Sequence, residues 1–599
     1  MAKSVSALAA AHRADPAAIA KTLRETYERI EAAADPSMFI TLRDEADVLA
    51  EARRLAETDA HLPLLGVPVA VKDNIDVAGL ATTAACLSFA YEPERDATAV
   101  ARLRAAGAVV IGKTNLDQFA TGLVGVRSPY GVPRNALRPD LVPGGSSSGS
   151  GVAVARGIVP IALGTGTGGS GRIPPGLATT VGLKPSLGLI STAGVVPACR
   201  SLDCVSVFAL TVEDAFAALA AMASEDTADP YSRAFALPPL PAPAPRLRIA
   251  VPRASDRIFF GDASAEASFS AAIGQVETLG WTVVEVDISP LLDAARLLYE
   301  GAWVAERTAA VGDFIARRPD DVHPVTRAII APGATLSAVD AFRGFYRLAD
   351  HARSAKTLFT GIDALMVPTA PTSYTLGDLE ADPIGPNSRL GTYTNFVNLL
   401  DLCGLAVPAA LARDRTPFGV TFLAPAGRDA TLAGIGGAFH AATGLPLGAL
   451  GSGAAPSPPM VAGPAEGEIA VAVVGAHLSG MPLNRELVEL GGRCLEATVT
   501  ARDYRLFALP GTTPPRPGLL RVAEGTGTSI AIETWALSPS AFGRFVAGVP
   551  APLSIGSLRL ADGRLVKGFL VEAEATIGAR DVSSYGGWRA ASAAMARER

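Results

Sequence analysis

This chain of 599 residues contains few cysteines and few aromatic side chains, and its net charge is small. The five cysteines form no C-x-x-C pair, so the sequence indicates neither a disulfide framework nor a cysteine-based zinc site. A reducing compartment such as the cytoplasm is therefore expected. Aromatic residues make up 6% of the chain, so the core must be packed mainly with alanine, valine, leucine and isoleucine. The 52 basic and 58 acidic residues nearly balance and no segment is strongly basic, so nucleic acid is not expected as a partner.

Long hydrophobic runs are also absent. The nearest candidate for a membrane span, residues 399–412, contains Asp401 and is shorter than the roughly 18 residues that a span needs. The N-terminal residues lack the apolar centre of a secretory signal, so no signal peptide is expected. Hydrophobic residues nevertheless reach 49% of the chain, against 18% charged, which excludes a disordered protein and supplies a large core.

Helical and strand-like patterns alternate over the first three quarters of the chain. They predict helices at 16–34, 43–59 and 97–107, and strands within 62–79, 107–115, 247–254, 281–288 and 363–373. This alternation is typical of an α/β domain, which we place at residues 1–450. The proline-rich stretch 237–246 is interpreted as a surface excursion within that domain, because the α/β pattern resumes after it.

The composition changes beyond residue 450. Residues 451–467 are rich in Gly, Pro and Ala and predict a linker. The segments that follow alternate between apolar and polar residues and are separated by turn residues. They predict a second, small, β-rich domain at residues 468–599.

Three motifs match known patterns only superficially. Residues 107–114 fit the phosphate-loop string G-x-x-x-x-G-K-T, but the residues between the two glycines predict a strand instead of a loop. Residues 145–149 fit the G-x-S-x-G pattern of a nucleophile elbow, yet Pro143-Gly144 stands where a strand is required. The six histidines form no H-E-x-x-H or Cys/His cluster. We therefore expect no nucleotide, metal or other cofactor.

Two Gly/Ser-rich loops and one lysine carry a stronger signal. Lys72 ends an apolar strand, so its side chain either reaches solvent or is buried and neutral. Ser170 follows Gly168 and Gly169, which allow backbone N–H groups to turn towards a ligand, as in an oxyanion hole. A buried lysine with a lowered pKa can serve as the base for a serine nucleophile.

These residues stand in a longer pattern. GGSSSGSGVAVARGIVPIALGTGTGGSGRIPP, at 144–175, resembles the signature of the amidase signature family, and GVPVAVKDN (66–74) and GKTNLDQFATG (112–122) resemble further blocks of it. The resemblance implies a central mixed β-sheet covered by helices, and acyl transfer by a triad of Lys72, Ser146 and Ser170, with Ser146 after a cis peptide bond. It also implies an oxyanion hole at Thr167, Gly168 and Gly169, and places Gly122 beside the substrate. The chain departs from the family at Gly166, where an aspartate is usual, and this leaves the rigidity of the nucleophile loop in question.

The kind of amide is indicated by two other segments. Residues 181–215 and 297–311 resemble the allophanate hydrolase branch of the family, in which a tyrosine and an arginine bind the substrate carboxylate. Here these residues are Tyr299 and Arg307, which on one helix would lie about two turns apart on the same side. The alternative is that Arg307 only forms a surface ion pair with Glu300 or Glu306.

The predicted second domain resembles the extra domain of that branch, a β-barrel of the γ-glutamyl-cyclotransferase type. The resemblance implies that this domain decarboxylates the N-carboxycarbamate left after deamination, and His477 is the candidate residue. Two alternatives remain open: His477 only shapes a turn, or the domain is purely structural.

The resulting expectation is an allophanate hydrolase that converts urea-1-carboxylate to ammonia and carbon dioxide. The alternatives are an amidase for another carboxylated amide such as malonamate, a glutamine-amidotransferase component, and a non-catalytic binding protein. The resemblance further implies a homodimer, and a urea carboxylase or similar enzyme as the source of allophanate.

Overall fold

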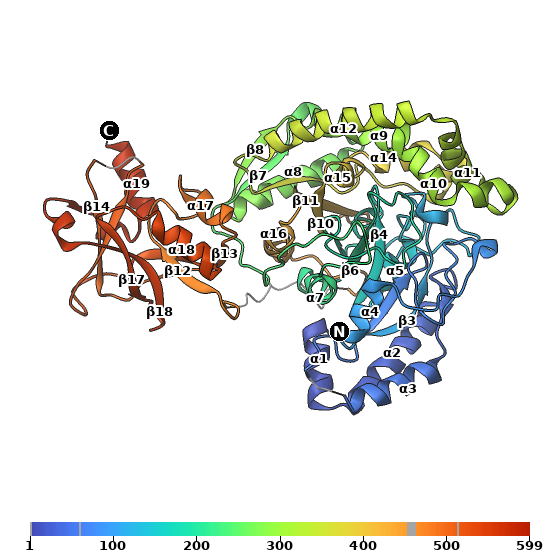
Figure 1. The fold of residues 1–599 in the computed structure, drawn as a ribbon, viewed down its shortest axis with the longest axis horizontal. Coiled ribbons are helices and arrows are strands. Elements are labelled where there is room, and N and C mark those ends of the chain that lie inside the picture. The colour runs from blue at the N-terminus through green and yellow to red at the C-terminus, as the bar shows by residue number, and fades with distance from the viewer. Residues whose placement is uncertain (1–2, 59–60, 452–462, 512–513, 599) are drawn as a thin grey trace. The chain divides into compact units, whose positions relative to one another are not determined.

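The computed structural model describes residues 3–58, 61–451, 463–511 and 514–598, and the chain divides into two compact units (Figure 1). The first comprises Met1–Leu237, Ile249–Leu279 and Val283–Pro458, and the second comprises Pro238–Arg248, Gly280–Thr282 and Pro459–Arg599. Most of the predicted linker 451–467 lies outside the described residues. Within the described part of the chain, no helix combines the length and apolar character that crossing a bilayer requires.

An eleven-stranded mixed sheet forms the centre of the first unit, as the resemblance implied. In spatial order its strands are β1 (Phe39–Leu42), β3 (Val109–Thr114), β2 (Pro68–Lys72), β4 (Ile161–Gly166), β6 (Cys204–Ala209), β5 (Val181–Lys184), β10 (Leu402–Leu411), β11 (Pro417–Pro425), β9 (Ala364–Pro368), β7 (Arg248–Pro252) and β8 (Thr282–Val286). Strand β2 pairs in parallel with both β3 and β4, whereas β4 pairs antiparallel with β6. Because β2 and β4 run in the same direction, their carboxyl ends meet at one edge of the sheet.

Helices surround this sheet (Figure 1). They are α1 (Val5–Ala14), α2 (Ala17–Ala33), α3 (Glu45–Ala56), α4 (Thr98–Ala105), α5 (Ser148–Ala155), α6 (Ile173–Gly176), α7 (Val212–Met222), α8 (Ala263–Thr278), α9 (Ser289–Glu300), α10 (Ala302–Arg317), α11 (Pro324–Ile330), α12 (Ala338–Leu358), α13 (Leu376–Ala381), α14 (Gly385–Leu390), α15 (Phe396–Leu399) and α16 (Asp429–Thr443). The three helices predicted from periodicity are α2, α3 and α4. One buried cluster joins Leu23 of α2, Val48 of α3 and Ile111 of β3, so the apolar faces of α2 and α3 cover the sheet.

The second unit contains two sheets, which confirms the predicted β-rich fold. The larger has the order β13 (Arg493–Val499), β16 (Ala531–Leu537), β12 (Ile469–Val473), β18 (Leu565–Val571), β17 (Leu553–Arg559), and the smaller has β15 (Pro517–Arg521), β14 (Tyr504–Ala508), β19 (Arg580–Asp581). Its helices are α17 (Asn484–Glu489), α18 (Pro539–Ala547) and α19 (Trp588–Arg597). Just beyond the edge strands, the N–H of Ala501 donates to the carbonyl of Arg559 at 2.9 Å. The two edges of the larger sheet thus approach each other at one end, which limits the exposed edge.

The proline-rich stretch 237–246 differs from its prediction. All but its first residue lies in the second unit, although it precedes β7 in the chain. The N–H of Ala242 donates to the carbonyl of Cys494 on the edge strand β13 at 3.1 Å. The N–H of Arg246 donates to the Ser479 hydroxyl at 3.1 Å. Proline-rich chain is suited to such an edge, since it can supply occasional N–H donors without forming a full strand.

Candidate active site

Lys72 occupies the carboxyl end of β2, where the parallel strands β2 and β4 end together. Every residue of β2 is buried, and Lys72 itself has no exposed surface. Its Nζ donates to Thr165 Oγ1 of β4 and to Ser146 Oγ, both at 2.7 Å. Of the two sequence alternatives for this lysine, the structure has the buried one.

Ser146 lies between Lys72 and Ser170. Its hydroxyl donates to Ser170 Oγ at 2.9 Å, so the three side chains form one continuous hydrogen-bonded row. The peptide bond between Gly145 and Ser146 is cis, as the resemblance implied. The Gly/Ser run is no flexible linker, because residues 144–151 are buried and α5 begins within them at Ser148.

The charge of Lys72 is set mainly by its burial. Loss of hydration disfavours the ammonium form and lowers the pKa of Lys72 to about 7, although Asp117, Asp203 and Cys204 act in the opposite direction. A substantial neutral fraction is therefore present near neutrality. A neutral amine at this position can accept a proton from Ser146.

The loop that carries Ser170 follows β4 and leads into α6. The Gly169 carbonyl accepts the N–H groups of Arg172 and Ile173. Within the described residues, the N–H groups of Gly168, Gly169 and Ser170 have no protein acceptor. The Arg172 guanidinium donates to the Gly168 carbonyl. The carbonyls of Gly168 and Gly169 are thereby occupied, while the N–H groups of the loop remain able to bind a developing oxyanion.

Two residues that the sequence did not single out hold this loop. The Thr167 hydroxyl donates to Asp203 Oδ1 at 2.5 Å, and the same carboxylate accepts the N–H of Ala198 at 2.8 Å. Burial raises the pKa of Asp203 to about 6, although these hydrogen bonds lower it. Asn398 Nδ2 donates to the Gly166 carbonyl at 2.8 Å. Asp203 stands in the stretch PACRSLDC, whose pattern gave no signal for this contact.

Gly166 is closely surrounded. A Cβ placed there would lie 3.0 Å from Ser206 Oγ and 3.3 Å from Cys204 Sγ, so even a Cβ would require these two side chains to shift slightly. In this chain the end of β4 is held by Asn398 and the following loop by Asp203, with no side chain at position 166.

Asp117 supports the opposite side of the site. Its carboxylate accepts the N–H groups of Gly125 and Arg127, each at 2.9 Å. A Cβ at Gly145 would lie 2.0 Å from Asp117 Oδ2, and one at Gly122 would lie 2.4 Å from the same oxygen. Gly122 is thus packed against the carboxylate that accepts the N–H groups of Gly125 and Arg127, and its expected contact with substrate stays a prediction.

Tyr299 and Arg307 are brought together, but not by the single helix that the sequence predicted. That prediction is wrong, because the chain breaks at Gly301, so that Tyr299 lies in α9 and Arg307 in α10. The Arg307 guanidinium nevertheless lies over the Tyr299 ring, 5.2 Å from its centre.

Arg307 is a buried cation with few protein contacts. It is 2% exposed, its Nη1 lies 3.4 Å from Thr121 Oγ1, and its Nε has no hydrogen-bond partner among the described residues. Glu306, one of the proposed surface partners, instead accepts the N–H and hydroxyl of Ser201. A buried guanidinium with unused donors is suited to an anionic ligand.

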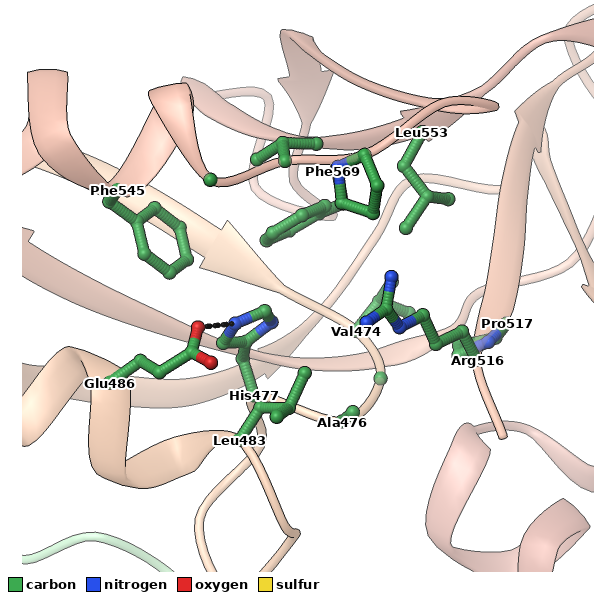
Figure 2. Close-up of a pocket in the computed structure, with 14 residues that line it drawn as sticks. Val474, Ala476, His477, Leu483, Glu486, Arg516, Pro517, Phe545, Leu553 and Phe569 are labelled. Carbon is green, nitrogen blue, oxygen red and sulfur yellow. Dashed lines mark hydrogen bonds and ion pairs between the residues drawn. The ribbon is translucent and has the colours of Figure 1, made fainter. Parts of the chain in front are cut away.

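His477 lies in the second unit, where its side chain lines a pocket (Figure 2). Its Nε2 lies 3.0 Å from Glu486 Oε2, and its ring stacks on Phe569 with ring centres 5.2 Å apart. The ring therefore lines a cavity, in addition to following a turn. Among the described residues, no cluster of three or more His, Cys, Asp or Glu side chains is arranged to hold a metal ion.

Comparison with known proteins matches both units. The family described as Amidase matches residues 21–433, and the family described as Allophanate hydrolase C-terminal domain matches residues 469–593. The urea amidolyase of Saccharomyces cerevisiae is 44% identical over 549 residues, which are 89% of this chain but 30% of that protein, so the chain spans about a third of such a relative. The urea amidolyase of Lachancea kluyveri is 42% identical over 95% of this chain and 32% of that protein. The selenomethionine-substituted structure of Kluyveromyces lactis allophanate hydrolase is 40% identical, has a TM-score of 0.79, and covers 96% of this chain and 97% of that one.

Proposed function

The chain belongs to the amidase family, and from this membership we propose that it hydrolyses allophanate, the carboxylate of urea, to ammonia and carbon dioxide. The observation that carries this proposal is the buried Arg307, whose guanidinium has unused donors and lies over Tyr299. The similarity to an allophanate hydrolase over 97% of that chain supports the same substrate.

Deamination begins at the row of Lys72, Ser146 and Ser170. With Lys72 neutral, the row donates in the direction opposite to that in the structure: Ser170 donates to Ser146, and Ser146 donates to Lys72. Lys72 then accepts the proton of Ser146, which takes the proton of Ser170 as Ser170 Oγ attacks the amide carbon. The N–H groups of Gly168, Gly169 and Ser170 stabilise the oxyanion, because within the described structure they lack protein acceptors. The proton returns to the departing nitrogen, ammonia leaves, and water hydrolyses the acyl-enzyme.

Substrate orientation follows from the position of the carboxylate. Arg307 offers a planar pair of donors that matches a carboxylate, and Tyr299 offers an additional hydroxyl donor. Holding the carboxylate there fixes the distal amide relative to Ser170. Binding energy from the carboxylate is thus used to position the reacting carbonyl.

A second step follows from the product. Deamination of allophanate leaves N-carboxycarbamate, which carries a carboxylate on each side of one nitrogen. We propose that the C-terminal unit decarboxylates it at His477. We further propose that the chain forms a homodimer in the cytoplasm. We also propose that an enzyme such as a urea carboxylase supplies its allophanate, which the similarity to urea amidolyases supports.

Four amides distinguish the proposed substrate from its alternatives. Allophanate and malonamate carry a carboxylate next to the amide, biuret is the neutral analogue of allophanate, and glutamine is the substrate expected of an amidotransferase component. We expect kcat/KM for allophanate to exceed that for biuret by about a hundredfold or more, because biuret leaves the buried Arg307 without an anion. Faster hydrolysis of malonamate or glutamine than of allophanate would contradict allophanate as the substrate. Equal kcat/KM for biuret and allophanate would contradict the proposed binding of the substrate carboxylate by Arg307.

A further inference from the structure

Asn395 carries an unused hydrogen-bond acceptor beside the loop that carries Ser170. The residue is 7% exposed, and its Oδ1 is buried without a partner among the described residues. A Cβ placed on Gly168 would lie 2.8 Å from this oxygen, so the Asn395 amide contacts the loop directly. An amide oxygen that is buried without a donor has lost its bond to water, and a donor on a ligand would restore that bond.

The same point of the loop also contacts helix α9. The Cβ position on Gly168 lies 3.0 Å from Leu298 Cδ2, and Leu298 directly precedes Tyr299. Asn395 Oδ1 therefore lies where the loop meets the helix that carries Tyr299. In the proposed reaction the substrate spans this junction, because Ser170 attacks its amide carbon and Tyr299 contacts its carboxylate.

The backbone around Asn395 is held in place by the protein itself. The N–H of Asn395 donates to the carbonyl of Gly391 at 3.0 Å. The Tyr393 hydroxyl accepts the N–H of Ile258 at 2.6 Å, and Tyr393 and Phe396 belong to one buried apolar cluster. The fold thus fixes the segment that presents this acceptor, as discrimination between similar ligands requires.

Thr394 presents a second unused polar group nearby. Its Oγ1 is also buried without a partner among the described residues, and a Cβ on Gly169 would lie 2.6 Å from it. A threonine hydroxyl can rotate and either donate or accept, so it can bind an N–H or a carbonyl. The amide oxygen of Asn395 can only accept. Of these two groups, Asn395 is therefore the one suited to select a ligand by its N–H.

We propose that Asn395 Oδ1 accepts the N–H between the reacting carbonyl and the carboxylate of allophanate. Allophanate, H₂N–CO–NH–COO⁻, has this N–H, whereas malonamate, H₂N–CO–CH₂–COO⁻, has a CH₂ group in its place. Asn395 is then a specificity-determining residue, because malonamate leaves its buried oxygen without a donor. The inference rests on the proposed function, which places the two ends of the ligand.

A binding experiment compares the two ligands in full-length Ser170→Ala, which lacks the nucleophile. Isothermal titration calorimetry gives the Kd for allophanate and for malonamate. We expect allophanate to bind about ten- to a hundredfold more tightly, the effect of an unpaired buried acceptor in the malonamate complex. The double variant Ser170→Ala/Asn395→Leu should lose this preference, because leucine has a similar size but no acceptor. Equal Kd values in Ser170→Ala, or an unchanged preference in the double variant, would overturn the inference.

Two further variants in the Ser170→Ala chain serve as controls, and they keep the test decisive if the leucine variant does not fold. Asn395→Asp keeps an acceptor oxygen, and its added negative charge weakens the binding of both anionic ligands, so the preference for allophanate should remain. Thr394→Val removes the neighbouring hydroxyl and should change the two Kd values by the same factor. Loss of the preference in Thr394→Val or in Asn395→Asp would contradict Asn395 Oδ1 as the acceptor.

Ammonia release from allophanate by the unmodified chain is measured in parallel. Release of ammonia together with equal binding of the two ligands by Ser170→Ala would refute the inference and leave the proposed function. A preference for allophanate that depends on Asn395, without ammonia release, would leave the contact and refute the proposed hydrolysis. Lack of measurable allophanate binding at millimolar concentrations would also contradict the contact.

Discussion

Lys72 is the residue on whose charge the proposed deamination depends. It is fully buried, and its hydrogen bonds go to two hydroxyl groups, so no carboxylate contacts it directly within the described structure. The more distant Asp117 and Asp203 offset only part of the cost of burying the ammonium. The fold therefore keeps this lysine able to exist as a neutral base near neutral pH.

The first prediction concerns the pH dependence of kcat/KM for ammonia release. Lys72 is protonated and inactive as a base below its pKa of about 7 and neutral above it, so kcat/KM should rise with pH through that region and then level off. Lys72→Met, which keeps a buried chain of similar length, should lower kcat by about 10²- to 10⁴-fold. Rates measured from about pH 5.5 to pH 8.5 provide the test, and a flat profile would contradict a titrating Lys72.

The second prediction concerns Arg307. Arg307→Lys replaces a planar fork with a point charge, so KM for allophanate should rise about tenfold or more while kcat changes less. Hydrolysis of the neutral biuret should be little affected. Arg317→Lys, an exposed position on the same helix α10, is the matched control. A fall in kcat alone, equal for charged and neutral amides, would exclude a role in carboxylate binding.

At the scale of elements, two parallel strands and the loops that follow them build the site. Strands β2 and β4 end together and place Lys72 against Thr165, α5 begins beside Ser146, and the loop after β4 carries Ser170. Asp203 then ties this loop to the segment that leads into β6, and Ser201 in the same segment binds Glu306 of α10. The loop that carries the nucleophile is thus connected through neighbouring residues to the helix that carries Arg307.

The third prediction follows from this connection. Asp203→Asn leaves one oxygen where a carboxylate accepts Thr167, Ala198 and Cys199, so at least one buried donor loses its acceptor. We expect kcat to fall about ten- to a hundredfold with KM little changed. Asp214→Asn is the control, because Asp214 is also buried with a pKa raised by burial to about 6, but it accepts the N–H of Val5 at the start of α1. Equal losses of kcat in the two variants would show a general loss of stability.

The row of Lys72, Ser146 and Ser170 could be predicted from the sequence because each residue stands in a contiguous motif. Helices α2, α3 and α4 could be predicted because their apolar periodicity is local. The supporting role of Asn398 could not, because Asn398 reaches Gly166 from 232 positions away and no local pattern encodes such a contact. Tyr299 and Arg307 were expected on one helix because their spacing fits two turns, whereas the break between α9 and α10 became visible only in the fold.

At the scale of the whole molecule, the chain carries two units with a candidate site in each. The first unit offers a serine nucleophile and a buried arginine, and the second offers a histidine pocket. The proposed reaction divides in the same way, since deamination needs a nucleophile and decarboxylation needs a proton donor. Each step can therefore be removed without touching the other site.

The fourth prediction tests that division. Ser170→Ala should release no ammonia from allophanate, and His477→Asn should accumulate the dicarboxylate. When the two variants are mixed, dicarboxylate made by the second can be decarboxylated by the first, so less of it should accumulate than with His477→Asn alone. The double variant Ser170→Ala/His477→Asn, added in place of Ser170→Ala, is the control. Equal accumulation in both mixtures would contradict release of the intermediate between molecules.

The proposed hydrolysis is tested most simply by ammonia release from allophanate by the unmodified chain, measured beside Ser170→Ala. We expect rapid release by the unmodified chain and loss of at least about 10³-fold in a variant that remains folded by circular dichroism. Failure of the well-folded unmodified chain to release ammonia would contradict allophanate as the substrate. Undiminished release by Ser170→Ala would contradict Ser170 as the nucleophile.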